Sequence, residues 1–326
     1  MNLKLKMELK EWHLKAPFIT AAEVIDAIQV LQVTVSRGGI SGRSETMGVD
    51  YLNETVESLQ AELSALDPAT IAELDGELLQ NLLPPGGSRN GLDCALWDLR
   101  AKQSVGGISG LSGITVEPVN TLFTLSLDDP EAMARQASAV PDLQRLKLKL
   151  NADAPLECLA AIRAARPDAQ LVIDANGSWS AELLMAVGDD LARCSVALLE
   201  QPLPRGADQA LEHLQYPVPV CADESCQSSA ELEAAADRYD AINIKLDKCG
   251  GLTDALKMRD WCRRYGKKIM VGNMLGSSLA MAPALVVAQG ADFVDLDGPL
   301  WQLDDVEPPL SIVRGVIAPP DPELWG

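Results

Sequence analysis

The chain has 326 residues, of which 47% are hydrophobic, so it is long enough for two domains and can bury a large core. Its net charge of −20 would repel phosphate backbones and argues against a nucleic-acid partner. Seven scattered cysteines without a CxxC pair, and no secretory signal, predict a cytoplasmic protein with reduced thiols. The longest apolar run, residues 279–288, contains Pro283 and is too short to span a membrane.

The first part of the chain, residues 1–112, has the pattern of an α+β domain in which strands precede helices. Alternating or β-branched side chains predict strands at residues 2–15, 27–36 and 40–46. A connecting loop is predicted over residues 16–26. Helical periodicity follows at about residues 50–65, 68–82 and 90–104. The last of these helices is predicted to begin with Asn90 as its N-cap.

From residue 119 the chain changes to a regular alternation of strands and helices. Eight strands are predicted, with seven helical patterns between them, at residues 119–126, 145–150, 170–175, 196–200, 219–223, 241–246, 268–272 and 292–297. Eight strands with right-handed crossovers favour a closed parallel barrel. An open doubly wound sheet is the alternative, but no GxGxxG phosphate loop follows the first strand. We therefore predict an α/β barrel over residues 113–305, with residues 306–326 returning to the first domain.

Five successive strands of this barrel end in charged side chains, at a nearly constant step along the chain. They are Lys149, Asp174, Glu200, Asp223 and Lys245. Because the carboxyl ends of barrel strands form one face, these side chains are expected to converge there. Only two histidines are present, which makes a Ser-His-Asp relay or a multi-histidine zinc site hard to build. Acid–base chemistry must therefore fall on Lys, Asp or Glu.

Three of these side chains, Asp174, Glu200 and Asp223, are carboxylates that would repel one another in a cleft. A divalent cation resolves this, and an all-oxygen ligand set favours magnesium over zinc. The alternative is that each acid caps the helix after its strand. Capping alone, however, does not predict carboxylates in three consecutive repeats flanked by lysines.

The lysines are predicted to be acid/base catalysts. Lys147 and Lys149 are two residues apart and so share one side of their strand, while Lys245 lies on the opposite side of an eight-stranded mouth. A lysine beside a second lysine and a metal ion is expected to have its pKa lowered toward neutrality. Two such lysines could remove a proton from one face of a substrate and return one to the other. The alternative is that they bind a phosphate or carboxylate without proton transfer.

A second carboxylate pair, Asp295 and Asp297, lies on the last barrel strand beyond the predicted metal ligands. Two carboxylates on one strand face suit a substrate ammonium group. Loop or helix capping is the alternative for this pair.

These residues resemble the enolase superfamily, in its muconate-lactonizing branch, and within it the dipeptide epimerases. The resemblance covers nearly the whole chain, and its motifs are RNGLDCALWDL (89–99), LKLKL (146–150), IDAN (173–176), LEQP (199–202), ADES (222–225) and NIKLDKCGG (243–251). It implies a modified (β/α)7β barrel under an α+β capping domain. It also implies a small dipeptide substrate, and it is compatible with a homo-oligomer.

Residue by residue, the resemblance assigns Mg²⁺ to Asp174, Glu200 and Asp223. It makes Lys149 and Lys245 the two bases of a 1,1-proton transfer at the α-carbon of the C-terminal residue. The remaining assignments are supporting ones: Lys147 assists catalysis and substrate binding, Asp295 and Asp297 hold the substrate ammonium, Thr124 contacts the substrate, and Asn176 and Glu224 support the site.

One departure from the family pattern concerns substrate specificity. In epimerases that act on Ala-Glu, an arginine of the capping domain pairs with the glutamate side chain, but residues 16–26 here contain no Lys or Arg. Ile25 lies near the matching position, so the predicted second residue is apolar or cationic rather than Glu. The alternatives on the same fold are an N-acylamino acid racemase and an o-succinylbenzoate synthase. A non-catalytic small-molecule binder is the alternative of another class, against which the intact lysines and carboxylates argue.

Overall fold

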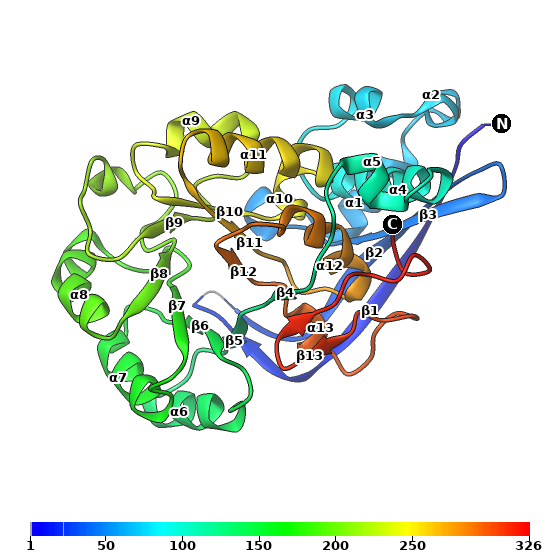
Figure 1. The fold of residues 1–326 in the computed structure, drawn as a ribbon. Helices are drawn as coiled ribbons and strands as arrows, with labels where there is room; N and C mark the ends of the chain where they lie inside the picture. Colours follow the sequence, from blue (N-terminus) through cyan, green and yellow to red (C-terminus); the bar gives the residue numbers. More distant parts are fainter. Residues whose placement is uncertain (1, 22) are drawn as a thin grey trace.

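The computed structural model describes residues 2–21 and 23–326, which form an α+β cap and a parallel barrel (Figure 1). The cap begins with an antiparallel sheet of three strands, β1 (Lys4–Ile19), β2 (Val24–Arg37) and β3 (Ile40–Thr46). Helical segments follow: η1 (Asp50–Leu52), α1 (Val56–Ser64), α2 (Pro68–Glu73), α3 (Gly76–Leu82), α4 (Gly87–Gln103) and α5 (Gly107–Ser112).

Two predictions for the cap are wrong at their boundaries. The predicted loop over residues 16–26 is mostly strand, because β1 continues to Ile19 after a register shift and β2 already begins at Val24. The barrel stabilises this extension, since Ile19 N donates to Ser126 Oγ at 3.1 Å. Helix α4 begins at Gly87, so Asn90 is not its N-cap. The Asn90 side chain is buried and donates hydrogen bonds to Thr46 and Asp247 instead.

The barrel consists of eight strands in the order of the chain, and every neighbouring pair with a hydrogen-bonded ladder is parallel. They are β5 (Phe123–Leu125), β6 (Arg145–Lys149), β7 (Gln170–Asp174), β8 (Val196–Glu200), β9 (Val220–Ala222), β10 (Ala241–Ile244), β11 (Lys268–Val271) and β12 (Phe293–Val294). Beside the first and last strands, Leu122 N donates to Val294 O at 2.7 Å. The predicted barrel with its capping domain is confirmed, and the alternative of an open doubly wound sheet is wrong.

The connections between the strands differ from the prediction at two points. Helices and 3-10 turns cover the outside of the barrel: α6 (Pro130–Ala139), α7 (Pro155–Ala165), α8 (Ala181–Arg193), η2 (Gln209–Leu211), η3 (Ser229–Glu231), α9 (Leu232–Ala235), α10 (Leu246–Cys249), α11 (Leu252–Arg264), α12 (Ser278–Val287) and α13 (Gly298–Trp301). Between β8 and β9 only η2 forms, because prolines at both ends of residues 202–219 disfavour a longer helix. The predicted strand 119–126 splits, and β4 (Val119–Asn120) leaves the barrel to pair with β14 (Val316–Ile317), which also pairs with β13 (Ile312–Val313).

The interior of the barrel is filled from the amino-terminal side by an apolar layer. Its buried members are Leu122, Val172, Leu198, Cys221, Ala241, Met270 and Phe293. Side chains alternate along a strand, so the residues two positions further along also point inward. On most of these strands those residues are polar, which places the polar site on top of an apolar floor.

Contacts from the end of the chain tie it to the cap, and Figure 1 shows the C-terminus near α4. Trp325 is buried and its Nε1 donates to Cys94 O at 3.2 Å, while Gly326 N donates to Asp98 Oδ1 at 2.6 Å. None of the helices in the described parts of the chain is long and apolar enough to cross a membrane.

Candidate active site

Strand register brings the predicted site residues together at the carboxyl ends of the strands. Lys149 on β6 lies opposite Asp174 on β7, which in turn lies opposite Glu200 on β8. Asp223 and Lys245 come directly after β9 and β10. All five residues are at least 93% buried. The sequence therefore predicted the convergence of these groups correctly in space, while their chemical roles stay predictions.

Lys147 lies at the centre of the carboxylates. Its Nζ is 3.0 Å from Asp174 Oδ2, 2.8 Å from Glu200 Oε2 and 2.9 Å from Asp295 Oδ2. Burial alone would lower the pKa of this ammonium group, but the surrounding carboxylates outweigh it and hold the pKa well above its usual range. Burial would also lower the pKa of Lys245, but the charge of Asp223 outweighs burial and raises it. The predicted lowering of the lysine pKa is thus wrong for Lys147 and Lys245 in this arrangement, because each of these two ammonium groups has a carboxylate in contact.

The two predicted bases each contact one predicted metal ligand. Lys149 Nζ donates to Asp174 Oδ2 at 2.7 Å and to Asn176 Oδ1 at 3.0 Å, and Lys245 Nζ donates to Asp223 Oδ2 at 2.7 Å. Burial would raise the pKa of Asp174, yet Lys147 and Lys149 lower it below its usual range. Lys245 and its neighbours do the same for Asp223. Both carboxylates are therefore ionised at neutral pH.

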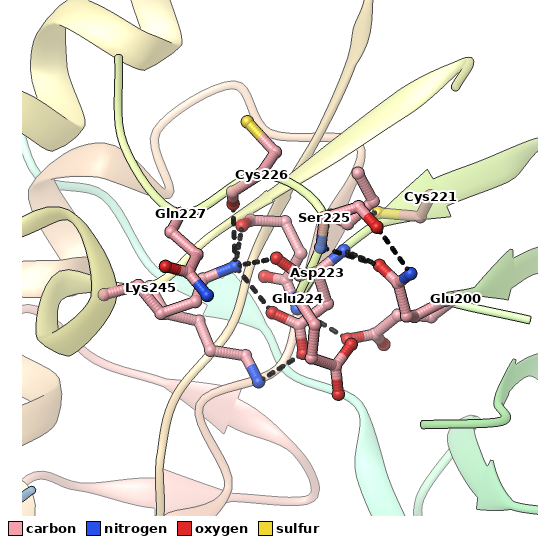
Figure 2. A network of polar contacts seen from close by, with 12 residues as sticks. Glu200, Cys221, Asp223, Glu224, Ser225, Cys226, Gln227 and Lys245 are labelled. Carbon is pink, nitrogen blue, oxygen red and sulfur yellow. Dashed lines mark hydrogen bonds and ion pairs between the residues drawn. The ribbon is translucent and has the colours of Figure 1, made fainter. Parts of the chain in front are cut away.

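Several buried groups that sequence reasoning missed or left as packing residues hold these carboxylates in place. Lys248 Nζ donates to Asp223 Oδ1 at 2.6 Å, whereas Lys245, shown beside Asp223 in Figure 2, donates to the other oxygen, Oδ2. Asn243 Nδ2 donates to Glu200 Oε1 at 2.7 Å. Asn243 lies on β10, two residues before Lys245, and that spacing could have identified it. Lys248 carries no such periodic signal, because it lies on the short helix α10.

The carboxylate set fits a hard cation in its chemistry. Glu200 Oε2 is buried without a hydrogen-bond partner, although Lys147 Nζ is 2.8 Å away. Burial and the charge of Asp174 raise the pKa of Glu200 to about 8, as expected for a carboxylate with too little compensating charge. Within the described residues no three Asp, Glu, His or Cys side chains form a ready coordination shell. Lys147 Nζ lies between Asp174 and Glu200 instead, so a cation would have to displace it.

A cavity of about 400 Å³ lies between the cap and the barrel. Its polar side is lined by Thr124, Lys147, Lys149, Asn176, Asp223, Glu224, Lys245, Asp295 and Asp297. Both predicted bases thus face the same space, which is large enough for a small substrate. Asn176 Nδ2 donates to Glu224 Oε1 at 3.3 Å, so the two predicted supporting residues contact each other.

Two carboxylates form one end of this cavity. Asp295 Oδ1 is buried without a hydrogen-bond partner, while Asp295 Oδ2 contacts Lys147. Asp297 Oδ2 accepts hydrogen bonds from Thr124 N at 2.7 Å and Trp301 Nε1 at 3.3 Å. Burial and the neighbouring Asp295 raise the pKa of Asp297 to about 6. This end of the cavity therefore attracts a cationic group.

The cap supplies the remaining wall, which is largely apolar. It includes Phe18, Ile25, Ile28, Met47, Val49 and Tyr51. Two acidic residues, Glu23 and Asp50, also line it. Among the described residues that line the cavity, the only cationic side chains are Lys147, Lys149 and Lys245. Ile25 also lines the cavity, while its contact with the substrate stays a prediction.

Comparison with known proteins identifies the fold family. Residues 3–113 match the N-terminal domain of mandelate racemase and muconate lactonizing enzyme, and residues 132–323 match the enolase C-terminal domain-like family. The chain is 42% identical to L-Ala-D/L-Glu epimerase of Escherichia coli, over 93% of this chain and 96% of that one. It is 37% identical to N-acetyl-D-glutamate racemase of a Pseudoalteromonas species, over 91% and 95% of the two chains.

A solved structure from Agrobacterium tumefaciens has the same fold. It is an enolase family member with homology to dipeptide epimerases, solved with sodium and L-Ala-L-Glu. It is 40% identical to this chain, covers 99% of this chain and 100% of its own, and superposes with a TM-score of 0.96. The epimerases and racemases among the relatives confirm that the chain is an isomerase. The chain belongs to the mandelate racemase and muconate lactonizing enzyme family of the enolase superfamily.

Proposed function

We propose that this isomerase is a magnesium-dependent dipeptide epimerase that inverts the α-carbon of the C-terminal residue of an L-Ala-L-X dipeptide. The observation that carries the proposal is the placement of Lys149 and Lys245 on β6 and after β10, facing one cavity from opposite sides of the barrel. A two-base 1,1-proton transfer requires this arrangement, because the two faces of a planar intermediate must each meet a proton carrier.

In the proposed mechanism the deprotonated lysine removes the α-proton of residue X. The electron pair of the broken C–H bond moves into the substrate carboxylate, and the protonated lysine on the other face donates a proton to the α-carbon. Asp174, Glu200 and Asp223 would hold Mg²⁺, which supplies positive charge to the substrate carboxylate and offsets the carboxylates that now raise the lysine pKa values. Lys147 then becomes available to assist binding of the substrate carboxylate.

The unpaired Asp295 Oδ1 and the carboxylate of Asp297 support binding of the substrate ammonium group. This favours a free dipeptide over an N-acylated amino acid or a succinylbenzoate precursor, neither of which carries an ammonium group. The N-acetyl-D-glutamate racemase among the relatives makes N-acylamino acid racemisation the second candidate. A protein that only bound a small molecule would not require two opposed lysines.

The role of Asp297 gives a testable pH dependence. Its pKa of about 6 lies above the ordinary value, so the carboxylate is protonated below pH 6 and loses its attraction for the ammonium group. The ratio of kcat/KM for wild type over Asp297→Asn, measured with L-Ala-L-Leu, should rise from pH 5 and level off above pH 7. The ratio cancels the titration of the lysines, which both proteins share. A ratio near one at every pH would contradict ammonium binding by Asp297.

The cap wall supports an apolar or cationic residue X. Ile25 and Ile28 offer apolar contacts, and Glu23 and Asp50 offer negative charge, whereas a glutamate side chain would meet no cation among the described cap residues that line the cavity. With L-Ala-L-Leu, L-Ala-L-Lys and L-Ala-L-Glu, followed by polarimetry, we expect kcat/KM for Ala-Glu to be lowest, by about tenfold or more. The Escherichia coli relative, an L-Ala-D/L-Glu epimerase, supports the opposite expectation, which is a preference for Ala-Glu. A preference for Ala-Glu would overturn this specificity but not the epimerase.

A further inference from the structure

The short helix α10 (Leu246–Cys249) follows Lys245 directly and contacts both the cap and the barrel. On the barrel side, Lys248 Nζ is fully buried and donates to Asp223 Oδ1, Asp223 O, Cys226 O and Asn243 O, at 2.6 to 3.1 Å. At its carboxyl end, Arg89 of α4 donates to Cys249 O at 2.7 Å and Gly250 O at 3.3 Å. The backbone after Lys245 is therefore held from two sides.

A third side is held by Asp247, whose carboxylate is buried and faces the cap. Its Oδ1 accepts hydrogen bonds from Thr46 Oγ1 at 2.9 Å, Met47 N at 3.2 Å and Asn90 Nδ2 at 2.9 Å. Thr46 is the last residue of β3, and Asn90 belongs to α4. One carboxylate of the barrel thus joins two separate elements of the cap.

The contact with Met47 matters because residues 47–51 all line the cavity. Met47 N is held by Asp247, and Val49 N donates to Glu54 Oε2 at 3.3 Å. Asp247 lies two residues after Lys245, whose Nζ faces the same cavity from the barrel side. The wall that the cap contributes and the base after β10 therefore share one anchoring group.

We infer that Asp247 is a positioning residue that fixes cap segment 47–51 and Lys245 in one arrangement around the substrate. The inference rests on the proposed function, in which Lys245 Nζ takes the α-proton of one diastereomer while the C–H electron pair moves into the substrate carboxylate. Hydrogen bonds to a buried carboxylate are strong, and losing them leaves Met47 N without its acceptor and Asn90 Nδ2 with Thr46 Oγ1 alone. Segment 47–51 and α10 are then free to separate.

The test compares the two faces of the substrate. In deuterated buffer with magnesium, Asp247→Ala should lose α-proton exchange on the order of 10- to 100-fold for the diastereomer whose exchange requires Lys245. Exchange of the other diastereomer, which requires Lys149, should fall much less. Lys245→Ala identifies which diastereomer is which. Asp247→Asn, which keeps the size of the side chain and one acceptor oxygen, should lie between wild type and Asp247→Ala.

A matched control is Asp93→Ala. Asp93 is fully buried on α4 and also joins the cap to the barrel, accepting from Thr253 N at 2.8 Å and Thr253 Oγ1 at 2.6 Å. Among the described residues, none of its hydrogen bonds reaches α10 or residues 47–51. This variant should leave the ratio of the two exchange rates unchanged. An equal loss for both diastereomers in Asp247→Ala, as in a general loss of stability, would overturn the positioning role.

A second readout does not depend on activity. Amide hydrogen exchange of the peptide containing residues 46–51 should be faster in Asp247→Ala and Asp247→Asn than in wild type, and unchanged in Asp93→Ala. Equal protection in all four proteins would overturn the inference. If wild type exchanged neither diastereomer, the proposed function would fail, and this amide measurement alone would decide whether Asp247 holds the cap segment.

Discussion

Replacing Lys149 or Lys245 by alanine is expected to abolish epimerisation, with a loss on the order of 10²- to 10⁴-fold or more. Each lysine carries the proton on one face only, so neither can complete the transfer alone. Each single variant should nevertheless retain exchange of the α-proton for the diastereomer that faces the remaining lysine. Proton NMR in deuterated buffer measures both reactions at once, because epimerisation gives new signals and exchange removes old ones.

The control for this experiment must separate chemistry from folding. Removing either lysine takes one ion-pair partner from a buried carboxylate, Asp174 at 2.7 Å or Asp223 at 2.7 Å, and so lowers stability, although Lys147 and Lys248 still contact these two carboxylates. Lys102→Ala removes a lysine from another ion pair, with Asp98 at 2.8 Å, and should keep full activity. Thermal melts should show that the site variants stay folded at the assay temperature. Full epimerisation by both single variants would contradict the two-base scheme.

The second large effect is expected at the predicted metal ligands. Chelation of divalent cations should abolish turnover, and Mg²⁺ should restore it, because the substrate carboxylate would otherwise carry the developing charge without a counter-ion. Glu200→Gln should need more Mg²⁺ for half-maximal activity and lose turnover on the order of 10²-fold. Titration of the chelated enzyme with Mg²⁺ gives both quantities. Activity that survives chelation and the Gln substitution would exclude these carboxylates as metal ligands.

The pKa of Glu200 adds a stability test for the same site. Its value of about 8 in the folded protein exceeds the ordinary value near 4.5, so the folded state binds its proton more tightly than the unfolded state. The free energy of unfolding of the cation-free protein should therefore fall as pH rises from about 4.5 to about 8. Glu200→Gln has no such carboxyl group, so its free energy of unfolding should fall less between these pH values. Denaturant unfolding at pH 5 and pH 8.5 can measure the difference. Added Mg²⁺ should stabilise wild type more than the variant.

The sequence predicted the convergence of the site because barrel strands impose a simple geometry. Lys149, Asp174 and Glu200 end successive strands, and parallel pairing in register places them side by side. Boundaries that depend on tertiary contacts were not predictable in the same way. The extension of β1 to Ile19 relies on Ser126 of the barrel, more than a hundred residues away in the chain. No local pattern contains that contact.

The electrostatics of the site were the least predictable part. The spacing of Lys147 and Lys149 showed that they share a strand face, but not that Lys147 would contact three carboxylates within 3.0 Å. The sign of a lysine pKa shift depends on such distances, because burial and ion pairing act in opposite directions. In the same way, no sequence pattern distinguishes Asp247 from the other acidic residues. Its hydrogen bonds with Thr46, Met47 and Asn90 are visible only in the structure.

The most direct test of the central proposal is proton NMR of wild-type enzyme with Mg²⁺ and L-Ala-L-X dipeptides in deuterated buffer, with X acidic, apolar or basic. We predict loss of the α-proton signal of X and growth of the signals of the L-D diastereomer, while the α-proton of Ala stays in place. No exchange at X with any dipeptide, together with exchange of an N-acylamino acid under the same conditions, would contradict the epimerase and favour racemisation of acylated amino acids.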